Sequence, residues 1–150
     1  MRRNWLSVAR HSPTSVLHIA CIALALSCFC KNPYDYEPYD PTKPDPPAAP
    51  VQLDPPDGKL ILNYAYPQDV VMKWQRVSGA AYYQVEVYQS SKPAPESLYA
   101  IGDKVYSTET AVTFNRHGCY WWRVRAYSPN WKWFTDWSPL WMFILPNPTS

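Results

Sequence analysis

The sequence predicts an all-β domain built as an antiparallel β-sandwich, on three observations. Several segments after residue 50 alternate apolar and polar side chains with a period of two, as a strand with one buried face does. Short clusters of Gly, Pro, Asn, Asp and Ser separate these segments. No stretch after residue 28 repeats apolar residues with the helical period. Many short strands with turns between them favour two packed sheets.

The clearest strand covers residues 119–127. Aromatic and β-branched residues dominate it, which favours a half-buried, central strand. One face carries Tyr120, Trp122, Val124 and Ala126, and we expect this face to point into the core. The other face carries Trp121, Arg123, Arg125 and Tyr127.

The remaining strands are shorter, and turn residues bound them. Pro55-Pro56-Asp57-Gly58 and Ser78-Gly79-Ala80 form turns, while residues 89–104 and 128–136 are predicted as loops. Trp74, Tyr83 and Val85 fall on inward faces. The expected strands are 51–53, a short or edge segment within 59–66, 70–74, 81–88, 105–107, 111–114 and 141–145.

Residues 50–145 resemble a fibronectin type III domain, an immunoglobulin-like sandwich. The pieces that carry the resemblance are Pro-Pro-Asp-Gly at 55–58, Trp74 followed by Val-Ser-Gly-Ala at 77–80, Tyr-Gln-Val-Glu-Val at 83–87, the strand 120–126, and Trp-Ser-Pro at 137–139. The resemblance implies that Trp74 packs between two sheets. It also implies that Tyr120 forms a tyrosine corner, its hydroxyl bonding backbone just upstream. Residues 59–69 are longer than the resemblance leads us to expect. We place the domain at 51–146, with a tail at 147–150.

The segment Trp137-Ser138-Pro139-Leu140-Trp141 resembles the Trp-Ser box of cytokine-receptor fibronectin domains, without its final serine. In that family, arginines of the neighbouring strand stack between the tryptophans. A guanidinium over an indole ring is favourable. We therefore expect Arg123 or Arg125 to stack on Trp137 or a nearby aromatic ring, with Trp141 in the same ladder. The structural interpretation of this ladder is preferred to a ligand site.

Three aromatic residues lie close together in the loop before this box: Trp131, Trp133 and Phe134. Large exposed aromatic groups usually mark a contact surface. They could stack on sugar rings or on another protein. The alternative is that they fold back over the open end of the sandwich.

The N-terminus reads as a targeting segment over residues 1–28. Arg2, Arg3 and Arg10 precede an apolar run over 16–27, which is short for a membrane span. Ala25-Leu26-Ser27-Cys28 resembles the lipobox of bacterial lipoproteins, which implies lipid on Cys28. Ordinary secretion and an uncleaved anchor are the alternatives. We expect an extracytoplasmic protein held at a membrane, with outer-membrane, cell-surface and periplasmic placement all open.

Residues 29–50 are predicted to be a disordered, extended linker. Seven prolines between 31 and 50 remove amide donors and fix the backbone, so neither a helix nor a central strand fits. The segment 34–40 interleaves tyrosines with carboxylates. It could be a cation site or a partner motif, but a soluble spacer is preferred, because disordered carboxylates lose much entropy on converging.

The composition argues against several functions. Without Arg2, Arg3 and Arg10, eleven basic residues face twelve acidic ones, a net charge of −1, so no basic patch for nucleic acid is expected. His117 lacks partners for a triad or a metal site, and no phosphate-binding loop occurs. Cys30 and Cys119 are expected to be unpaired. No metal, cofactor or catalytic residue is predicted.

The sequence therefore predicts a non-catalytic, membrane-tethered binding, adhesion or spacer module. Its expected partners are the membrane, through the lipid, and an unknown protein or cell-wall glycan. The alternative is a carbohydrate-binding accessory module that acts through the aromatic residues of 131–137.

Overall fold

The computed structural model describes residues 39–147, so the predicted leader and Cys28 lie outside the described part. The described residues form strands and loops with one short 3-10 helix, η1 (Pro95–Ser97). The strands are β1 (Gln52–Asp54), β2 (Lys59–Leu60), β3 (Gln68–Trp74), β4 (Tyr82–Tyr88), β5 (Leu98–Val105), β6 (Glu109–Phe114), β7 (Gly118–Tyr127) and β8 (Trp141–Leu145).

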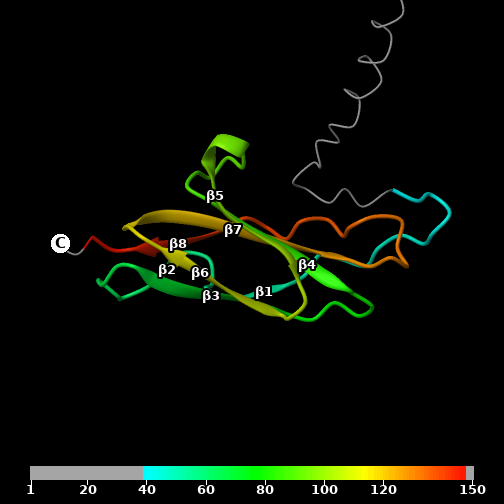
Figure 1. Ribbon diagram of the computed structural model, residues 1–150, viewed down its shortest axis with the longest axis horizontal. Helices are drawn as coiled ribbons and strands as arrows, with labels where there is room; N and C mark the ends of the chain where they lie inside the picture. The colour runs from blue at the N-terminus through cyan, green and yellow to red at the C-terminus, as the bar shows by residue number, and fades with distance from the viewer. Residues whose placement is uncertain (1–38, 148–150) are drawn as a thin grey trace, which may run out of the picture. The chain divides into compact units, whose positions relative to one another are not determined.

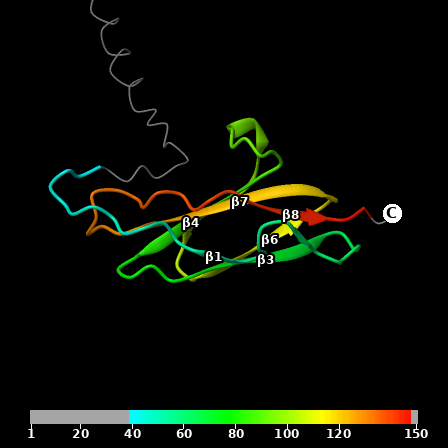
Figure 2. The same ribbon diagram turned by 180° about the vertical axis from the view of Figure 1, so that it is seen from behind.

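The strands form two sheets that pack face to face (Figures 1 and 2), which confirms the predicted sandwich. One sheet has the order β1-β3-β6 and the other the order β2-β8-β7-β4-β5. Neighbouring strands are antiparallel except β2 and β8, which run parallel. β7 lies at the centre of the larger sheet, between β4 and β8, as the aromatic content of 119–127 predicted.

The core forms between the inward faces of the two sheets. Trp122, Val124 and Ala126 of β7 have no exposed surface, and Tyr120 keeps 1%. The predicted core residues Trp74, Tyr83, Val85, Tyr120, Trp122 and Val124 all lie in one buried cluster. The Trp74 and Tyr83 rings meet edge to face, with centroids 5.3 Å apart. Burial of this aromatic and aliphatic surface is the main favourable contribution to folding.

Tyr120 occupies the position of a tyrosine corner. Its hydroxyl donates a hydrogen bond to the backbone carbonyl of Arg116, four residues upstream, at 3.0 Å. Burial raises the pKa of the Tyr120 hydroxyl above its ordinary value. The bond ties the turn before β7 to the core and leaves the buried hydroxyl satisfied.

The segment after β1 crosses from the smaller sheet to the larger one. Gly58 adopts a φ of 77°, which the predicted turn over 55–58 requires. The Asp57 carboxylate accepts the Met142 amide at 2.8 Å, and the Gly58 amide donates to the Met142 carbonyl at 2.8 Å. β2 then pairs with β8. The extra length of 59–69 is therefore used to add an edge strand to the second sheet.

The predicted loop over 89–104 is wrong in its second half, because β5 occupies residues 98–105. β5 is an edge strand whose residues are all half-buried or exposed, so it lacks a clean alternation. Its pairing with β4 shifts register twice, which further obscures the pattern. The predicted strand at 105–107 is correspondingly the end of β5 and the turn that follows.

Candidate functional site

A ladder of alternating rings and guanidinium groups covers part of the outer face of β4 and β7. The Trp137 ring lies between two arginines, with its centroid 4.3 Å from Arg123 Cζ and 4.4 Å from Arg125 Cζ. The Tyr88 ring lies beyond Arg123 at 5.4 Å, and the Phe134 ring lies beyond Arg125 at 3.9 Å. We call these five residues the ladder. Each guanidinium thus contacts two rings, and a cation held over an aromatic face is attracted to it.

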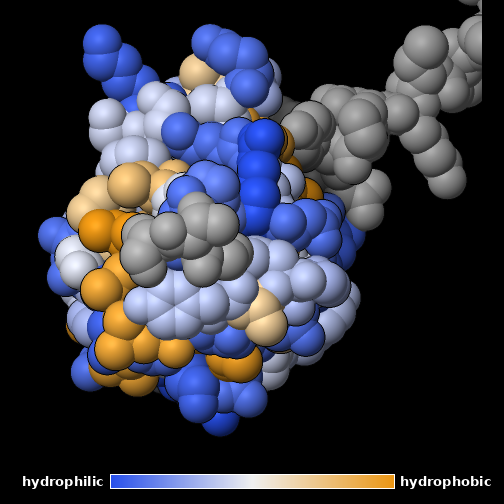
Figure 3. All heavy atoms as spheres, turned by 90° about the vertical axis from the view of Figure 1, so that its left-hand side faces the viewer, coloured by the Kyte–Doolittle hydropathy of each residue, from blue (hydrophilic) through white to orange (hydrophobic). Residues whose placement is uncertain are grey.

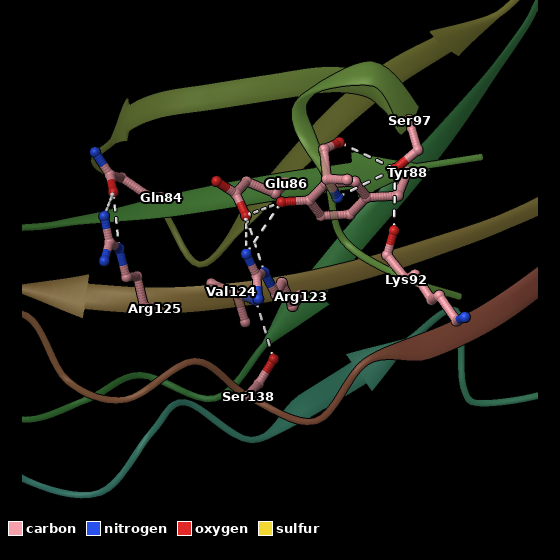
Figure 4. Close-up of polar contacts among 10 residues, drawn as sticks. Gln84, Glu86, Tyr88, Lys92, Ser97, Arg123, Val124, Arg125 and Ser138 are labelled. Carbon is pink, nitrogen blue, oxygen red and sulfur yellow. Dashed lines mark hydrogen bonds and ion pairs between the residues drawn. The ribbon is translucent and has the colours of Figure 1, made fainter. Parts of the chain in front are cut away.

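Glu86 neutralises one end of the ladder (Figure 4). Arg123 donates to Glu86 Oε2 from Nε at 2.9 Å and from Nη2 at 2.7 Å, and the Tyr88 hydroxyl donates to the same oxygen at 2.5 Å. Burial and the bond to Glu86 raise the pKa of Tyr88 to about 12. Glu86 and Arg123 are direct cross-strand partners, so the sheet register itself brings the two charges together.

Arg125, at the other end, bonds to a neutral amide instead of a carboxylate. Its Nε and Nη2 donate to Gln84 Oε1 at 2.9 and 2.7 Å, and Gln84 Nε2 donates to Asp103 Oδ1 at 2.7 Å. Figure 4 shows the bonds from Arg125 to Gln84, and the Gln84 amide in turn links the cation to the Asp103 carboxylate on β5. Burial lowers the pKa of Arg125 from its ordinary value.

Two hydroxyl side chains hold Trp137 in place. The Ala126 amide donates to Thr135 Oγ1 at 3.0 Å, and the Val124 amide donates to Ser138 Oγ at 2.9 Å. The backbone amides of Thr135 and Ser138 donate back to the carbonyls of Ala126 and Val124, both at 2.9 Å. Residues 135–138 thus pair with β7 ahead of β8. Their two hydroxyl oxygens accept from the β7 amides, as the carbonyls of a neighbouring strand would. The sequence pattern gave no sign of this, because serine and threonine here read as loop residues.

The structure brings together three of the four residues predicted for the ladder: Arg123, Arg125 and Trp137. Trp141 lies elsewhere. Its ring meets the buried Trp122 ring edge to face, with centroids 6.3 Å apart, since Trp141 begins β8 opposite Trp122. Phe134 takes a place in the ladder that the sequence did not predict.

The three aromatic residues of the 131–134 loop have different environments. Phe134 is only 5% exposed and packs in a second cluster with Tyr82 and Tyr127. Trp131 packs against the main core, over Gly79. Trp133 is half-buried, and its ring centroid lies 6.3 Å from that of Tyr39 and 5.4 Å from that of Phe134. The loop folds back over the end of the sandwich, which removes Phe134 from the candidate ligand contacts.

The last part of the predicted linker is docked on this loop. We call residues 39–47 the strap. The Asp40 amide donates to the Lys132 carbonyl and the Lys132 amide donates to the Pro44 carbonyl, both at 3.0 Å. The Lys132 ammonium pairs with the Asp45 carboxylate, which raises the pKa of Lys132. This corrects the predicted free linker over 39–50. Proline lacks an amide donor, but its carbonyl still accepts, so a proline-rich chain can bind one edge of a loop.

Two features define the architecture. The sheets have the orders β1-β3-β6 and β2-β8-β7-β4-β5, and β7 carries a tyrosine corner. The chain has a fibronectin type III-like fold. No family model matches the sequence, and a search of curated proteins found no match.

Among solved structures, the chain is similar to a fibronectin type III-like protein from Clostridium thermocellum, with 20% identity, a TM-score of 0.44, and coverage of 67% of this chain and 95% of that one. It is also similar to the fibronectin type III domain of human fibronectin type III domain containing protein 3, with 16% identity, a TM-score of 0.41, and coverage of 70% and 88%.

At the strapped end of the fibronectin type III-like domain, the strap and the 132–136 loop line an open surface hollow of about 310 Å³. Rings and prolines form much of its wall, with Tyr39 and Pro46 on the strap side and Trp133 on the loop side. Charged groups from Asp45, Lys132 and Asp136 complete the lining. The hollow is lined by side chains from two segments about ninety residues apart in the sequence, so no local motif could have predicted it.

The opposite end of the domain has a different set of surface features. A hollow of about 490 Å³ lies beside Gln89, Arg116 and His117. Hydrophobic residues gather on one part of this end (Figure 3). Leu62, between β2 and β3, is 72% exposed. Cys119 is an exposed free thiol on β7.

The described part of the chain covers residues 39–147. Within that range, no three His, Cys, Asp or Glu side chains are grouped to hold a metal ion. The same range contains no helix long and apolar enough to cross a membrane.

Proposed function

We propose that the protein is a membrane-tethered, extracytoplasmic binding, adhesion or spacer module of fibronectin type III-like fold. The order of the chain carries this proposal. A basic and apolar leader ends at Cys28, a proline-rich segment follows, and the sandwich comes last. Several acyl chains on one cysteine would hold such a chain at a bilayer stably, whereas a single chain would not.

Fatty-acid labelling of cells tests the tether. The full chain and the variants Cys28→Ser and Cys119→Ser are expressed with radiolabelled palmitate and then immunoprecipitated. We expect label on the full chain and on the Cys119→Ser control, and none on Cys28→Ser. Label that persists on Cys28→Ser, or an unlabelled full chain, would contradict the lipid anchor and favour ordinary secretion.

A second candidate function is carbohydrate binding at the strapped end. The hollow of about 310 Å³ favours it, because ligand sites combine apolar and aromatic walls with a few polar groups. A glycan array probed with the full chain is the first test. Binding to cell-wall glycans would support this function, and an array without signal would leave the tethered protein-binding or spacer module.

A further inference from the structure

We propose that the strap and the 132–136 loop together form a saccharide subsite, with Tyr39 and Trp133 as its ring walls and Asp136 as its hydroxyl acceptor. The proposal rests on the second candidate function and specifies the residues and the ligand chemistry for it. The strap is then part of the binding site and more than a spacer.

The rings of the subsite come from both segments. Tyr39 of the strap is 55% exposed, and its ring is tilted by 59° from that of Trp133. Tilted rings that keep exposed surface offer C–H-rich sugar faces a place to pack, while Pro46 and Pro47 continue the apolar wall. Trp131 does not line the hollow, and Phe134 lines it with only 5% of its surface exposed.

Among residues 39–147, the ion pairs around the hollow involve the carboxylates of Asp40 and Asp45 but not that of Asp136. Lys43 pairs with Asp40 at 3.3 Å, and Lys132 pairs with Asp45. Asp136 is exposed, and the hydrogen bond that involves it uses its backbone carbonyl, which accepts from Thr135 Oγ1 at 2.9 Å. Its carboxylate is therefore available to accept hydroxyl groups, and hydrogen bonds from a hydroxyl to a carboxylate are among the stronger ones.

This combination fits a neutral polyhydroxylated ligand better than a cation. A cationic ligand near Asp136 would also meet the Lys132 ammonium on the same rim. A sugar can donate hydroxyl hydrogens to Asp136 and Asp45 and accept from Lys132. Mixed donors and acceptors beside rings are what a pyranose requires.

The strap holds the subsite together. Two backbone hydrogen bonds at 3.0 Å and the Lys132–Asp45 ion pair fix its position on the loop. Removing Tyr39 takes away one wall and leaves the loop intact. Changing Asp136 to asparagine removes the negative charge and one of the two acceptor oxygens and leaves both walls. The two changes therefore test two separate parts of the proposal.

Isothermal titration calorimetry of the full chain in detergent micelles tests the subsite. The probes are the tetramers of N-acetylglucosamine, glucose (β-1,4-linked) and mannose. We expect at least one to bind with a Kd below about 1 mM. Asp136→Asn and Tyr39→Ala should each weaken that binding by about tenfold, the effect of losing one charged hydrogen bond or one ring contact. Glu96→Gln, an exposed carboxylate outside the hollow, is the matched control and should leave it unchanged.

The outcomes separate this proposal from the broader ones. No heat with any of the three tetramers would overturn the subsite. Binding that survives both Asp136→Asn and Tyr39→Ala would also overturn it, while carbohydrate binding elsewhere on the protein would stand. Neither result bears on the lipid anchor, which the labelling of Cys28→Ser tests separately.

Discussion

The ladder and the strap use the same chemistry with different consequences. Both combine cations, carboxylates and aromatic rings. In the ladder ion pair, the Arg123 and Glu86 side chains are 23% and 17% exposed. In the ion pair at the strap, the side chains of Lys132 on the loop and Asp45 on the strap are 30% and 77% exposed. Arg123 and Glu86 come from neighbouring strands whose register already places them opposite each other, so little further entropy is lost when they meet. The strap must order an otherwise independent segment.

This difference in exposure indicates which ion pairs stabilise the fold. Pairs preorganised by a sheet and shielded from water stabilise it, and exposed pairs contribute about 0–1 kcal/mol. The ladder is therefore expected to behave as part of the structure. We expect the strapped end to open without unfolding the sandwich, as a surface that admits a ligand would require.

Trp137→Ala should have the largest effect. It removes the ring between Arg123 and Arg125 and leaves both guanidinium groups with one ring contact fewer. We expect a loss of about 2–4 kcal/mol in the free energy of unfolding, below or at the range for truncating a fully buried tryptophan. Urea denaturation measures it. Trp133→Ala is the control from the strapped end, and an equal loss there would remove the contrast.

Ser138→Ala should cost about 1–3 kcal/mol, because it leaves the Val124 amide buried without its acceptor. Ser78→Ala changes an exposed serine in a turn and should be neutral. Thermal unfolding of both variants checks this. Equal melting temperatures would show that the hydroxyl does not support the Trp137 segment.

Glu86→Gln should destabilise the domain by about 1–2 kcal/mol, since Arg123 would keep its rings but lose its carboxylate. Glu109→Gln is a suitable control, because its pair with Lys73 is exposed. Chemical denaturation of the two proteins would compare a half-buried ion pair with an exposed one. A larger loss for Glu109→Gln would contradict the account of the ladder.

The contribution of Tyr88 to the stability of the domain depends on pH in the alkaline range. Its pKa of about 12 in the folded chain exceeds the value near 10 of an unfolded tyrosine. The folded state therefore binds more protons between these values. The stability that Tyr88 contributes is complete below about pH 10 and is lost as pH rises towards 12. Unfolding free energies over this window should fall less steeply for Tyr88→Phe, and identical slopes would contradict the raised pKa.

Asp45→Asn should have the smallest effect on global stability, at most about 0.5 kcal/mol, because the ion pair that it breaks is exposed. Its effect should be local, with faster exchange of the Lys132 amide. Asp69→Asn, an exposed carboxylate on β3, provides the comparison. A global loss as large as that of Ser138→Ala would mean that the strap belongs to the cooperative core.

Alternation and composition predicted the residues that face the core, because a period of two directly reports which side of a strand is buried. They also predicted that Arg123 and Arg125 share a face with aromatic neighbours. They could not identify Glu86 and Gln84 as the partners, since the β4–β7 register is set by the whole sheet.

The sequence did not predict the strand β5 or the docking of the strap, and the two reasons are related. β5, an edge strand, lacks a clean alternation of buried and exposed residues, and the proline-rich strap has few amide donors of its own. Their positions are fixed by segments distant in the sequence, β4 for β5 and residue 132 for the strap. Asp136 gave no signal either, because its surroundings form only when the strap is docked.

Amide hydrogen exchange of the full chain measures the local stability of the ladder and of the strap in one experiment. The Val124 and Ala126 amides, which bind Ser138 and Thr135, should exchange only through global unfolding. The Asp40 and Lys132 amides should exchange faster than these but slower than in a free peptide, through local opening of the strap. Exchange of Lys132 at the free-peptide rate, or as slowly as Val124, would contradict the contrast between the ladder and the strap.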